Sequence, residues 1–323
     1  TVHVPVAVFR SIDRNEHSRR VISRGVSLSA GRPSLKMIHE GWRALQAAER
    51  DPSSYRPTEE LFTPEGLLYG VMLHPSGKRY SEEINGTRAS GWGDGQNHDF
   101  QETAPFRALR SSLPLPAAIE EGRRLASQNP TLAKAMGNDV TPQQMVYWMS
   151  DLVDITLLDF IFSQQDRIGN IDFVPYWYWI VNGKIQTRKA VGRTPPDDIA
   201  ASNPVYLKRT ELGDNDAGVR VSYVNYTKRT GMLEKLCHYR ADAYRQLMRL
   251  DRDFKAGGPL YEYVQTTFGL SGRESKQLVA NTGAAAAILR DSCNAGRLRF
   301  DLEPEQFLLT GGVAAEDVDC ESP

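Results

Sequence analysis

Hydrophobic positions along this chain follow a strand pattern first and a helix pattern later. Apolar and polar residues alternate in four early segments, and this spacing predicts strands over residues 2–12, 21–28, 67–73 and 78–84. Beyond Pro114 the apolar residues recur every three or four positions, which is typical of helices that bury one face. The pattern predicts an α+β protein with a β-rich first lobe, residues 1–115, and a mostly helical second lobe, residues 116–323.

The clearest helix start is at Thr141. A threonine at the N-cap, Pro142 in the first turn and Gln144 at the reciprocal position form the signature of a capping box. One stripe of core residues follows at helical spacing: Met145, Met149, Leu152, Val153, Thr156 and Phe160. Asp151 and Asp154 lie off this stripe, so we expect them to be either solvated or paired.

An aromatic strand is expected over residues 173–181, followed by a hairpin turn at Asn182-Gly183 and a return strand over 185–191. Four consecutive residues of the first strand are aromatic: Tyr176, Trp177, Tyr178 and Trp179. Alternate side chains of a strand face opposite ways, which favours packing on both faces. Stacking on a base or a sugar is the alternative.

The rest of the chain is mostly helical by pattern. Residues 192–210 are rich in proline and charge and predict a loop, and a strand is expected over 219–226. Helices are then predicted over 231–254, 260–268, 272–280, 284–295 and 304–309. Ser271 and Glu274 form a second capping-box signature, and the acidic tail after Gly311 is expected to be mobile.

Composition excludes several classes of protein. The 323 residues can bury a large core, and 40% hydrophobic with 24% charged residues is ordinary for a globular chain. Lys and Arg number 39 against 40 Asp and Glu, so the net charge implies no attraction to nucleic acid or a membrane surface. No segment approaches the roughly 18 apolar residues that a membrane helix needs.

Cysteine usage leaves two states open. Cys237, Cys293 and Cys320 are too few and too scattered for a disulfide scaffold or a zinc site. One disulfide and free thiols are both compatible with this spacing. The chain starts at Thr1, which indicates a processed or trimmed sequence that can conceal a signal peptide.

Two acidic segments carry the candidate chemistry. The first places Asp166, Arg167 and Asn170 between an apolar helix and the aromatic strand, and the second places Asp214 and Asp216 in a Gly-containing loop. Polar groups between buried segments need partners, and carboxylate and amide oxygens suit Mg²⁺. The order of these residues predicts a metal–phosphate site. The alternatives are a turn with a salt bridge at Asp166-Arg167 and an Asx turn in the second segment.

These two motifs and their order resemble the atypical kinases, namely the secreted and Golgi kinases of casein-like proteins and proteoglycan sugars and the HipA-type kinases. The resemblance covers residues 141–255 and implies a two-lobed kinase-like fold that uses ATP with Mg²⁺ or Mn²⁺. It assigns the catalytic roles to Asp166 and Arg167 and the metal to Asn170, Asp214 and Asp216. The spacing from Asp166 to Asn170 is four where those kinases have five, so Asp172 is a further candidate ligand.

A kinase also needs a nucleotide-binding lysine paired with a helical glutamate. Only Lys36 and Lys78 lie in the first 115 residues, and Lys36 has Glu40 near it on a predicted helix. Surface roles for both lysines are the alternative. A glycine-rich segment can approach phosphates through its backbone N–H groups or serve as a plain loop: Gly91, Gly93 and Gly95.

The sequence therefore predicts phosphoryl transfer to a hydroxyl on a protein or glycan. An inactive kinase-like binding module stays open, as does a kinase-fold enzyme of adenylylation or glutamylation. A metal-dependent hydrolase is disfavoured because the six histidines show no metal-ligand spacing. The resemblance to secreted kinases favours an exported, periplasmic or secreted location.

Overall fold

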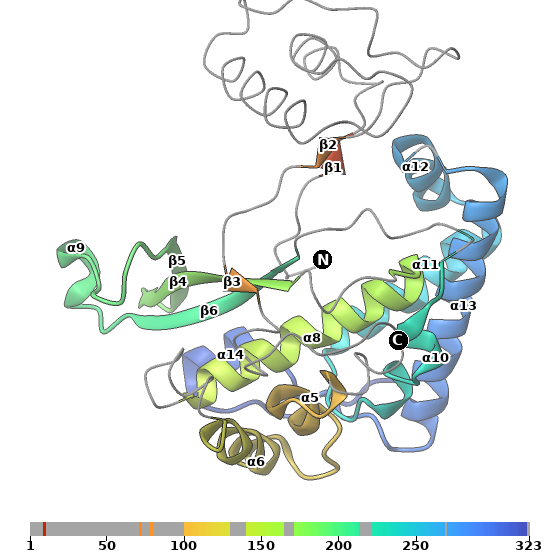
Figure 1. Cartoon of the computed structure of the whole chain (residues 1–323). Coiled ribbons are helices and arrows are strands. Elements are labelled where there is room, and N and C mark those ends of the chain that lie inside the picture. Colours follow the sequence, from red (N-terminus) through yellow and green to blue (C-terminus); the bar gives the residue numbers. More distant parts are fainter. Residues whose placement is uncertain are drawn as a thin grey trace, which may run out of the picture. The chain divides into compact units, whose positions relative to one another are not determined.

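The computed structural model describes residues 9–10, 71–72, 78–79, 100–129, 140–164, 171–212, 221, 223–268 and 270–321. The chain divides into two compact units, one formed by Val8–Leu73 and the other by Thr1–Ala7 together with His74–Pro323. In the smaller unit, strands β1 (Phe9–Arg10) and β2 (Val71–Met72) pair antiparallel. The remaining described elements belong to the larger unit and combine helices with an antiparallel sheet, which confirms the α+β class (Figure 1).

The sheet of the larger unit has β4 (Ile171–Val181) at its centre. Strand β6 (Val205–Leu212) lies along one edge of β4. Strands β5 (Lys184–Lys189) and β3 (Lys78–Arg79) lie along its other edge, and every pairing is antiparallel. Of the strands predicted over 67–73 and 78–84, the structure describes two short pieces, β2 and β3, which pair with β1 and β4 respectively.

The β4–β5 hairpin confirms the turn prediction. Asn182 and Gly183 have φ angles of 51° and 73°, the left-handed values that a two-residue hairpin turn of this kind needs. The aromatic residues of β4 pack on both faces of the sheet, as alternation requires. Trp177 is buried with Ala190 and Ile199, whereas Tyr178 is buried on the other side with two partners, Tyr147 and Leu207.

Helix α8 (Pro142–Phe162) is the central element of the larger unit. It contacts β6 and five described α-helices: α5 (Ala104–Leu109), α6 (Leu115–Ser127), α10 (Tyr226–Arg229), α13 (Gly272–Asn294) and α14 (Pro304–Thr310) (Figure 1). Sixteen of its 21 residues are buried, so the prediction of one core-facing stripe was too narrow. A helix surrounded on all sides has no solvent face to reserve for polar residues.

The N-terminus of α8 confirms only half of the predicted capping box. The Thr141 hydroxyl accepts a hydrogen bond from the Gln144 backbone N–H, as expected. The Gln144 side chain, however, does not return to the cap, because it bonds the backbone of Lys208 in β6.

Between β5 and α11 the structure corrects three predictions. Residues 192–210, expected as a loop, include α9 (Asp197–Ala200) and the first part of β6. A strand was expected over 219–226, but the described residues of this range form none, and Asn225 caps α10 (Tyr226–Arg229).

The long helix predicted over 231–254 is interrupted. A 3₁₀ turn, η3 (Leu233–Lys235), is followed by an extended segment, and α11 begins only at Ala241 and ends at Ala256. The extended segment pairs with Arg299, whose backbone N–H donates to the Cys237 carbonyl while its carbonyl accepts from the Tyr239 N–H. Backbone pairing with a distant segment therefore overrides the local helical pattern, and His238 lies on this segment rather than on a helix.

The last helices follow the prediction in part. Helix α12 (Pro259–Phe268) lies where expected, and α13 begins with the predicted capping box of Ser271 and Glu274. The two helices expected over 272–280 and 284–295 form the single helix α13. The gap between the two predicted helices covered residues 281–283, but α13 continues through them, and Gly283 lies close to the Asp251 carboxylate. Helix α14 also agrees with the prediction.

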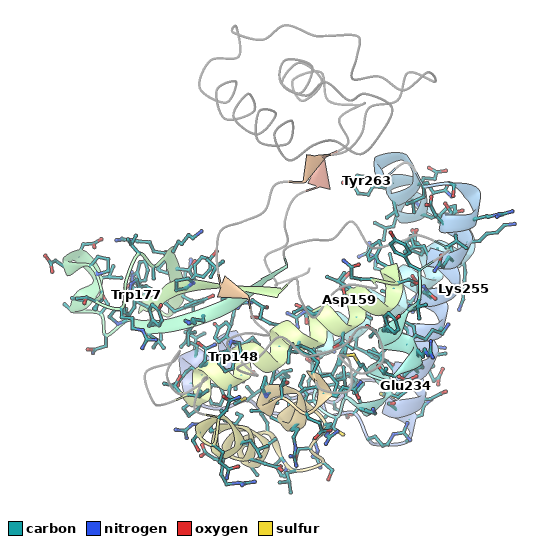
Figure 2. All side chains as sticks on the ribbon, viewed as in Figure 1. Trp148, Asp159, Trp177, Glu234, Lys255 and Tyr263 are labelled. Atoms are coloured by element: carbon teal, nitrogen blue, oxygen red, sulfur yellow. A yellow bond between two sulfur atoms is a disulfide. The ribbon has the colours of Figure 1, made fainter. Side chains whose placement is uncertain are left out.

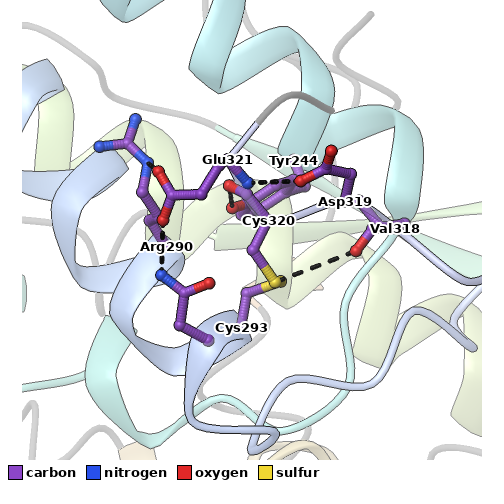
Figure 3. Close-up of a disulfide and its surroundings, with 8 residues drawn as sticks. Tyr244, Arg290, Cys293, Val318, Asp319, Cys320 and Glu321 are labelled. Atoms are coloured by element: carbon purple, nitrogen blue, oxygen red, sulfur yellow. Dashed lines mark hydrogen bonds and ion pairs between the residues drawn. A yellow bond between two sulfur atoms is a disulfide. The ribbon is translucent and has the colours of Figure 1, made fainter.

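The tail after Gly311 is held in place rather than mobile. Cys320 forms a disulfide with Cys293 of α13, which decides between the two cysteine states (Figure 3). Val318 is buried, and the Glu316 N–H donates to the Phe300 carbonyl. In the part of the chain that the structure describes, no helix combines the length and apolar character needed to cross a membrane.

Candidate functional site

Most residues that the sequence assigns to the site lie outside the described residues. These are Asp166, Arg167, Asn170, Asp214, Asp216, Lys36, Glu40, Gly91, Gly93 and Gly95. Lys78 begins strand β3, and Asp172 is the second residue of β4. The structure does describe the chain on both sides of the two acidic segments, and this framework decides where each segment is anchored.

The two acidic segments are anchored next to each other. The first, residues 165–170, enters the sheet at Ile171, and the second, residues 213–220, leaves it after Leu212. Ile171 and Leu212 are direct partners in the β4–β6 register. Directly opposed residues of antiparallel strands have Cα atoms only about 4.5–5.5 Å apart. Two segments separated in sequence by residues 171–212 are therefore joined to the same end of the sheet.

Strand β3 lies at this end of the sheet as well. Lys78 pairs with Phe173 on the edge of β4 opposite β6, two residues from Ile171. Arg79 pairs with Asp172 in the same register. The backbone thus places Lys78, one predicted nucleotide-binding lysine, on the strand that pairs with β4 close to the anchor Ile171.

The exit of α8 toward the first acidic segment is held by side-chain amides. Ser163 ends the helix with φ 52°, and its backbone N–H donates to the Asp159 carbonyl (Asp159 is labelled in Figure 2). Three amide nitrogens lie 2.9–3.1 Å from the Ser163 Oγ, from Asn225, Gln277 and Asn281. Asn225 and Asn281 also donate to the last carbonyls of the helix, those of Phe160 and Ile161.

The chemistry of the hydroxyl fixes the orientation of one amide. Ser163 Oγ offers two acceptor lone pairs and one proton, so it cannot accept from three N–H groups. In Asn225 and Asn281 each nitrogen also donates to a carbonyl, which fixes these two amides as donors. Gln277 Oε1 has no hydrogen-bond partner, so exchanging its oxygen and nitrogen lets it accept the Ser163 proton. The Ser163 hydroxyl then makes three hydrogen bonds that hold the end of α8 to α10 and α13.

Helix α8 is also fixed against β6. The Gln144 amide donates to the Lys208 carbonyl at 2.8 Å and accepts from the Lys208 N–H at 2.7 Å, as a neighbouring strand would. The Trp148 indole donates to the same carbonyl (Figure 2). One turn further, Asp151 accepts from the Arg209 guanidinium at 2.6 Å and from the Thr210 N–H at 3.0 Å. These bonds set the register between the helix that leads into the first acidic segment and the strand that leads into the second.

Burial makes the Asp151–Arg209 pair a strong constraint. The Asp151 side chain is 0% exposed and that of Arg209 is 11% exposed. Burial alone would lower the pKa of Arg209, but the Asp151 carboxylate outweighs it and the net pKa is raised. The guanidinium therefore stays charged, and removing the carboxylate would leave it buried without its main counter-charge. A second buried pair, Asp154 with Arg240 at 2.8 Å, joins α8 to the start of α11.

The sequence did not predict the roles of these supporting residues. For Asp151 and Asp154 it left two alternatives, solvation or pairing. The structure decides for pairing in both. The available signal was a carboxylate on a helix with too many apolar neighbours to face solvent. Neither arginine partner could be named, because Arg209 is 58 residues from Asp151 and Arg240 is 86 residues from Asp154.

Among the described residues, no group of three His, Cys, Asp or Glu side chains could hold a metal ion. The carboxylates of the predicted metal site belong to the two acidic segments and lie outside that part of the chain. Comparison of the chain with protein-family models, with curated proteins and with solved structures finds no match.

Proposed function

We propose that this chain is an atypical kinase-like phosphotransferase. It transfers the γ-phosphoryl group of Mg-ATP or Mn-ATP to a hydroxyl on a protein or glycan and releases ADP. The β-rich and helical parts form two lobes in this proposal, as the resemblance implies. The observation that carries it is the pairing of Ile171 with Leu212, which anchors both acidic segments at one end of the sheet.

The order of elements supports the same proposal. A buried helix, α8, leads into the first acidic segment, which leads into β4, and the antiparallel strand β6 leads into the second. Phosphoryl transfer requires a base for the acceptor hydroxyl and metal ligands for the phosphates at one point in space. Adjacent anchors meet this requirement at little conformational cost, because each segment has only a few residues to span.

Each residue has a defined role in the proposal. Asp166 accepts the proton of the acceptor hydroxyl as its oxygen attacks the γ-phosphorus, and Arg167 pairs with the transferred phosphoryl group. Asn170, Asp214 and Asp216 would hold a Mg²⁺ ion, which would supply positive charge to offset the negative charge that develops on the phosphates. The rigid end of α8 at Ser163 limits the positions from which Asp166 can act.

Calorimetric titration of the protein with ATP, with Mg²⁺ or Mn²⁺ and without metal, tests the proposal first. We expect metal-dependent binding that Asp216→Asn weakens by tenfold or more, since each metal carboxylate offsets phosphate charge. Asp197→Asn is the matched control, because Asp197 is exposed at the start of α9 and distant in sequence from both acidic segments.

Three outcomes separate the alternatives. Metal-dependent binding with release of ADP in the presence of acceptor proteins or glycans supports the transferase. Binding with transfer of AMP to an acceptor would replace phosphorylation by adenylylation. No binding of Mg-ATP or Mn-ATP by the wild-type protein would refute an ATP-using transferase, and the inactive binding module would take its place.

Lys78 is the better candidate for the nucleotide-binding lysine. It lies on a strand paired with β4, as a kinase lysine requires, whereas Lys36 belongs to the unit formed by Val8–Leu73. We expect Lys78→Met to weaken metal–ATP binding by tenfold or more and Lys36→Met to leave it unchanged. The reverse result would transfer the role to Lys36 and its predicted partner Glu40.

The disulfide supports an exported location in this proposal. Disulfides persist mainly in secreted, periplasmic and other oxidising compartments. The Cys293–Cys320 bond fits such a setting, as does the resemblance to secreted kinases. Detection of the protein in the periplasm or culture medium of the cells that make it, rather than in the cytosol, would be the expected result.

A further inference from the structure

A pocket of about 570 Å³ opens between the β4–β5 hairpin and α14. Its floor is formed by Tyr147 of α8, Tyr178 of β4 and Arg209 of β6, and its apolar walls by Ile185 and Leu309. Charged groups of opposite sign also line it, Lys184 and Glu305. This volume lies within the usual range for sites that bind small molecules.

Tyr147 lines this pocket, and its hydroxyl has no hydrogen-bond partner among the described residues. The residue is 2% exposed, and no described residue accepts its proton or donates to it. Burial raises the pKa of Tyr147, so the hydroxyl is a proton donor at neutral pH. A buried hydroxyl without a hydrogen bond destabilises a fold, and phenylalanine would fill the same space without that cost. The hydroxyl is explained if a ligand supplies its partner.

The rest of the floor is equally rich in donors. The Tyr178 hydroxyl accepts from Arg209 at 2.9 Å, and its own proton has no acceptor among the described residues. The Arg209 guanidinium lies 4.9 Å from the Tyr147 ring centroid and is the part of its ion pair nearer to solvent, at 11% exposure against 0% for Asp151. The floor thus presents two hydroxyl protons beside a guanidinium whose charge Asp151 compensates, and these hydroxyl donors suit a carboxylate.

Glu305 gives the pocket a second preference. It lies in the first turn of α14, is exposed, and is the carboxylate that lines the pocket. A purely anionic ligand would be repelled by it, whereas a ligand with an ammonium group at its other end would pair with it. Ile185 and Leu309 offer apolar contact for the carbon skeleton between the two ends.

We propose that this pocket binds a small zwitterion of amino-acid or short-peptide size. Its carboxylate lies on the floor formed by Tyr147, Tyr178 and Arg209, and its ammonium group faces Glu305. The pocket lies away from Ile171, the residue that anchors the first acidic segment. Tyr178 is seven residues along β4 from Ile171, a distance of roughly 23 Å at about 3.3 Å per residue. The proposal of this binding pocket therefore does not depend on the proposed phosphotransferase activity.

The direct test measures ligand binding by calorimetry and by ligand-detected NMR. The ligands are the twenty standard amino acids, each tested singly at up to 5 mM, and glycyl-leucine. Succinate, which has no ammonium group, and propylamine, which has no carboxylate, are the matched comparison ligands. We expect at least one amino acid or the dipeptide to bind saturably and more tightly than both comparison ligands. Absence of saturable binding by every zwitterion would overturn the proposal, as would succinate binding equally tightly.

Variants separate a binding role from a structural one. Tyr147→Phe should lower the affinity for the zwitterion about tenfold, the loss expected for one hydrogen bond to a charged group. The same variant should leave the melting temperature unchanged or raise it. Glu305→Gln should lower the affinity for the zwitterion but not the affinity for succinate. Tyr263→Phe, at an exposed position of α12, should change neither property. Unchanged affinity in Tyr147→Phe, or a melting temperature several degrees lower, would overturn the assignment of the hydroxyl to a ligand.

Discussion

Removing the Cys293–Cys320 disulfide should destabilise the larger unit by a calculable amount. The two cysteines are 27 residues apart in sequence with Cα atoms 5.7 Å apart, so the bond closes a loop that includes α14 and the tail. In the chain-entropy treatment, a cross-link that closes a loop of this length raises the free energy of the unfolded chain by about 3.5 kcal/mol at 25 °C. In a unit of this size, that corresponds to a fall in melting temperature of about 7 °C.

The double variant Cys293→Ala with Cys320→Ala measures this effect. Thermal unfolding and urea unfolding of the variant and the wild type, followed by circular dichroism, give the two midpoints. The tail retains its other contacts in the folded variant, such as the Tyr244 hydroxyl donating to the Cys320 carbonyl and the ion pair of Arg290 with Glu321 (Figure 3). The expected change therefore reflects the unfolded chain more than lost native contacts.

Two controls isolate the covalent bond from the substitutions. Reductant should lower the melting temperature of the wild type toward that of the double variant and leave the variant unchanged. Cys237→Ala, at the free cysteine, should shift the midpoint far less. A double variant that melts within about 1 °C of the oxidised wild type would refute the loop-entropy reasoning.

Three further predictions concern charge and the end of α8. Burial, and next the Asp242 carboxylate, raise the pKa of Glu303 from 4.5 to about 7 in the folded protein. The contribution of Glu303 to the free energy of unfolding should therefore be greatest below pH 4.5 and be lost as the pH rises through 7. The loss, about 1 kcal/mol after solvent screening, should vanish in Glu303→Gln when urea midpoints are compared at pH 5 and 8.5. Asp151→Asn should cost about 3–5 kcal/mol in urea unfolding because its buried arginine loses its counter-charge, whereas Asp198→Asn in an exposed pair should change the midpoint far less. Asn281→Ala should speed hydrogen exchange at the last amides of α8, and unchanged exchange would contradict the role of its two hydrogen bonds.

Local signals in the sequence predicted elements wherever local physics decides the structure. The Asn182-Gly183 turn, the cap at Thr141 and the capping box at Ser271 each depend on residues within four positions, and each formed as expected. The prediction of a mobile tail was wrong because a contact distant in sequence decides its structure. Its acidic composition indicates mobility, but a bond to a cysteine 27 residues away holds it, and sequence spacing alone could not distinguish that bond from free thiols.

The candidate site was predictable as chemistry but not as geometry. Asp166, Asn170 and Asp216 could be selected because carboxylates and an amide between buried segments suit a metal. That the segments share an anchor point depends on the register of β6 against β4, and β6 begins inside a stretch rich in proline and charge that predicted a loop. Eight residue pairs along β4 override that local composition, as is common for strands whose partners are distant in sequence.

Helix α8 supports both proposed sites, and its rigidity predicts how they interact. It contributes Tyr147 to the pocket floor near one end and leads into the first acidic segment at the other. Coupling between two sites requires an element with two alternative arrangements that both ligands bias. A helix buried on all sides, bonded to β6 at Gln144 and Asp151 and closed at Ser163, offers no such alternative. We therefore expect the affinity for metal–ATP to change less than twofold when the pocket is saturated with its zwitterion, and the reciprocal titration to agree, because linkage makes the two effects equal. A fivefold change in either titration would show that α8 moves, and the rigid description of its contacts would then be wrong.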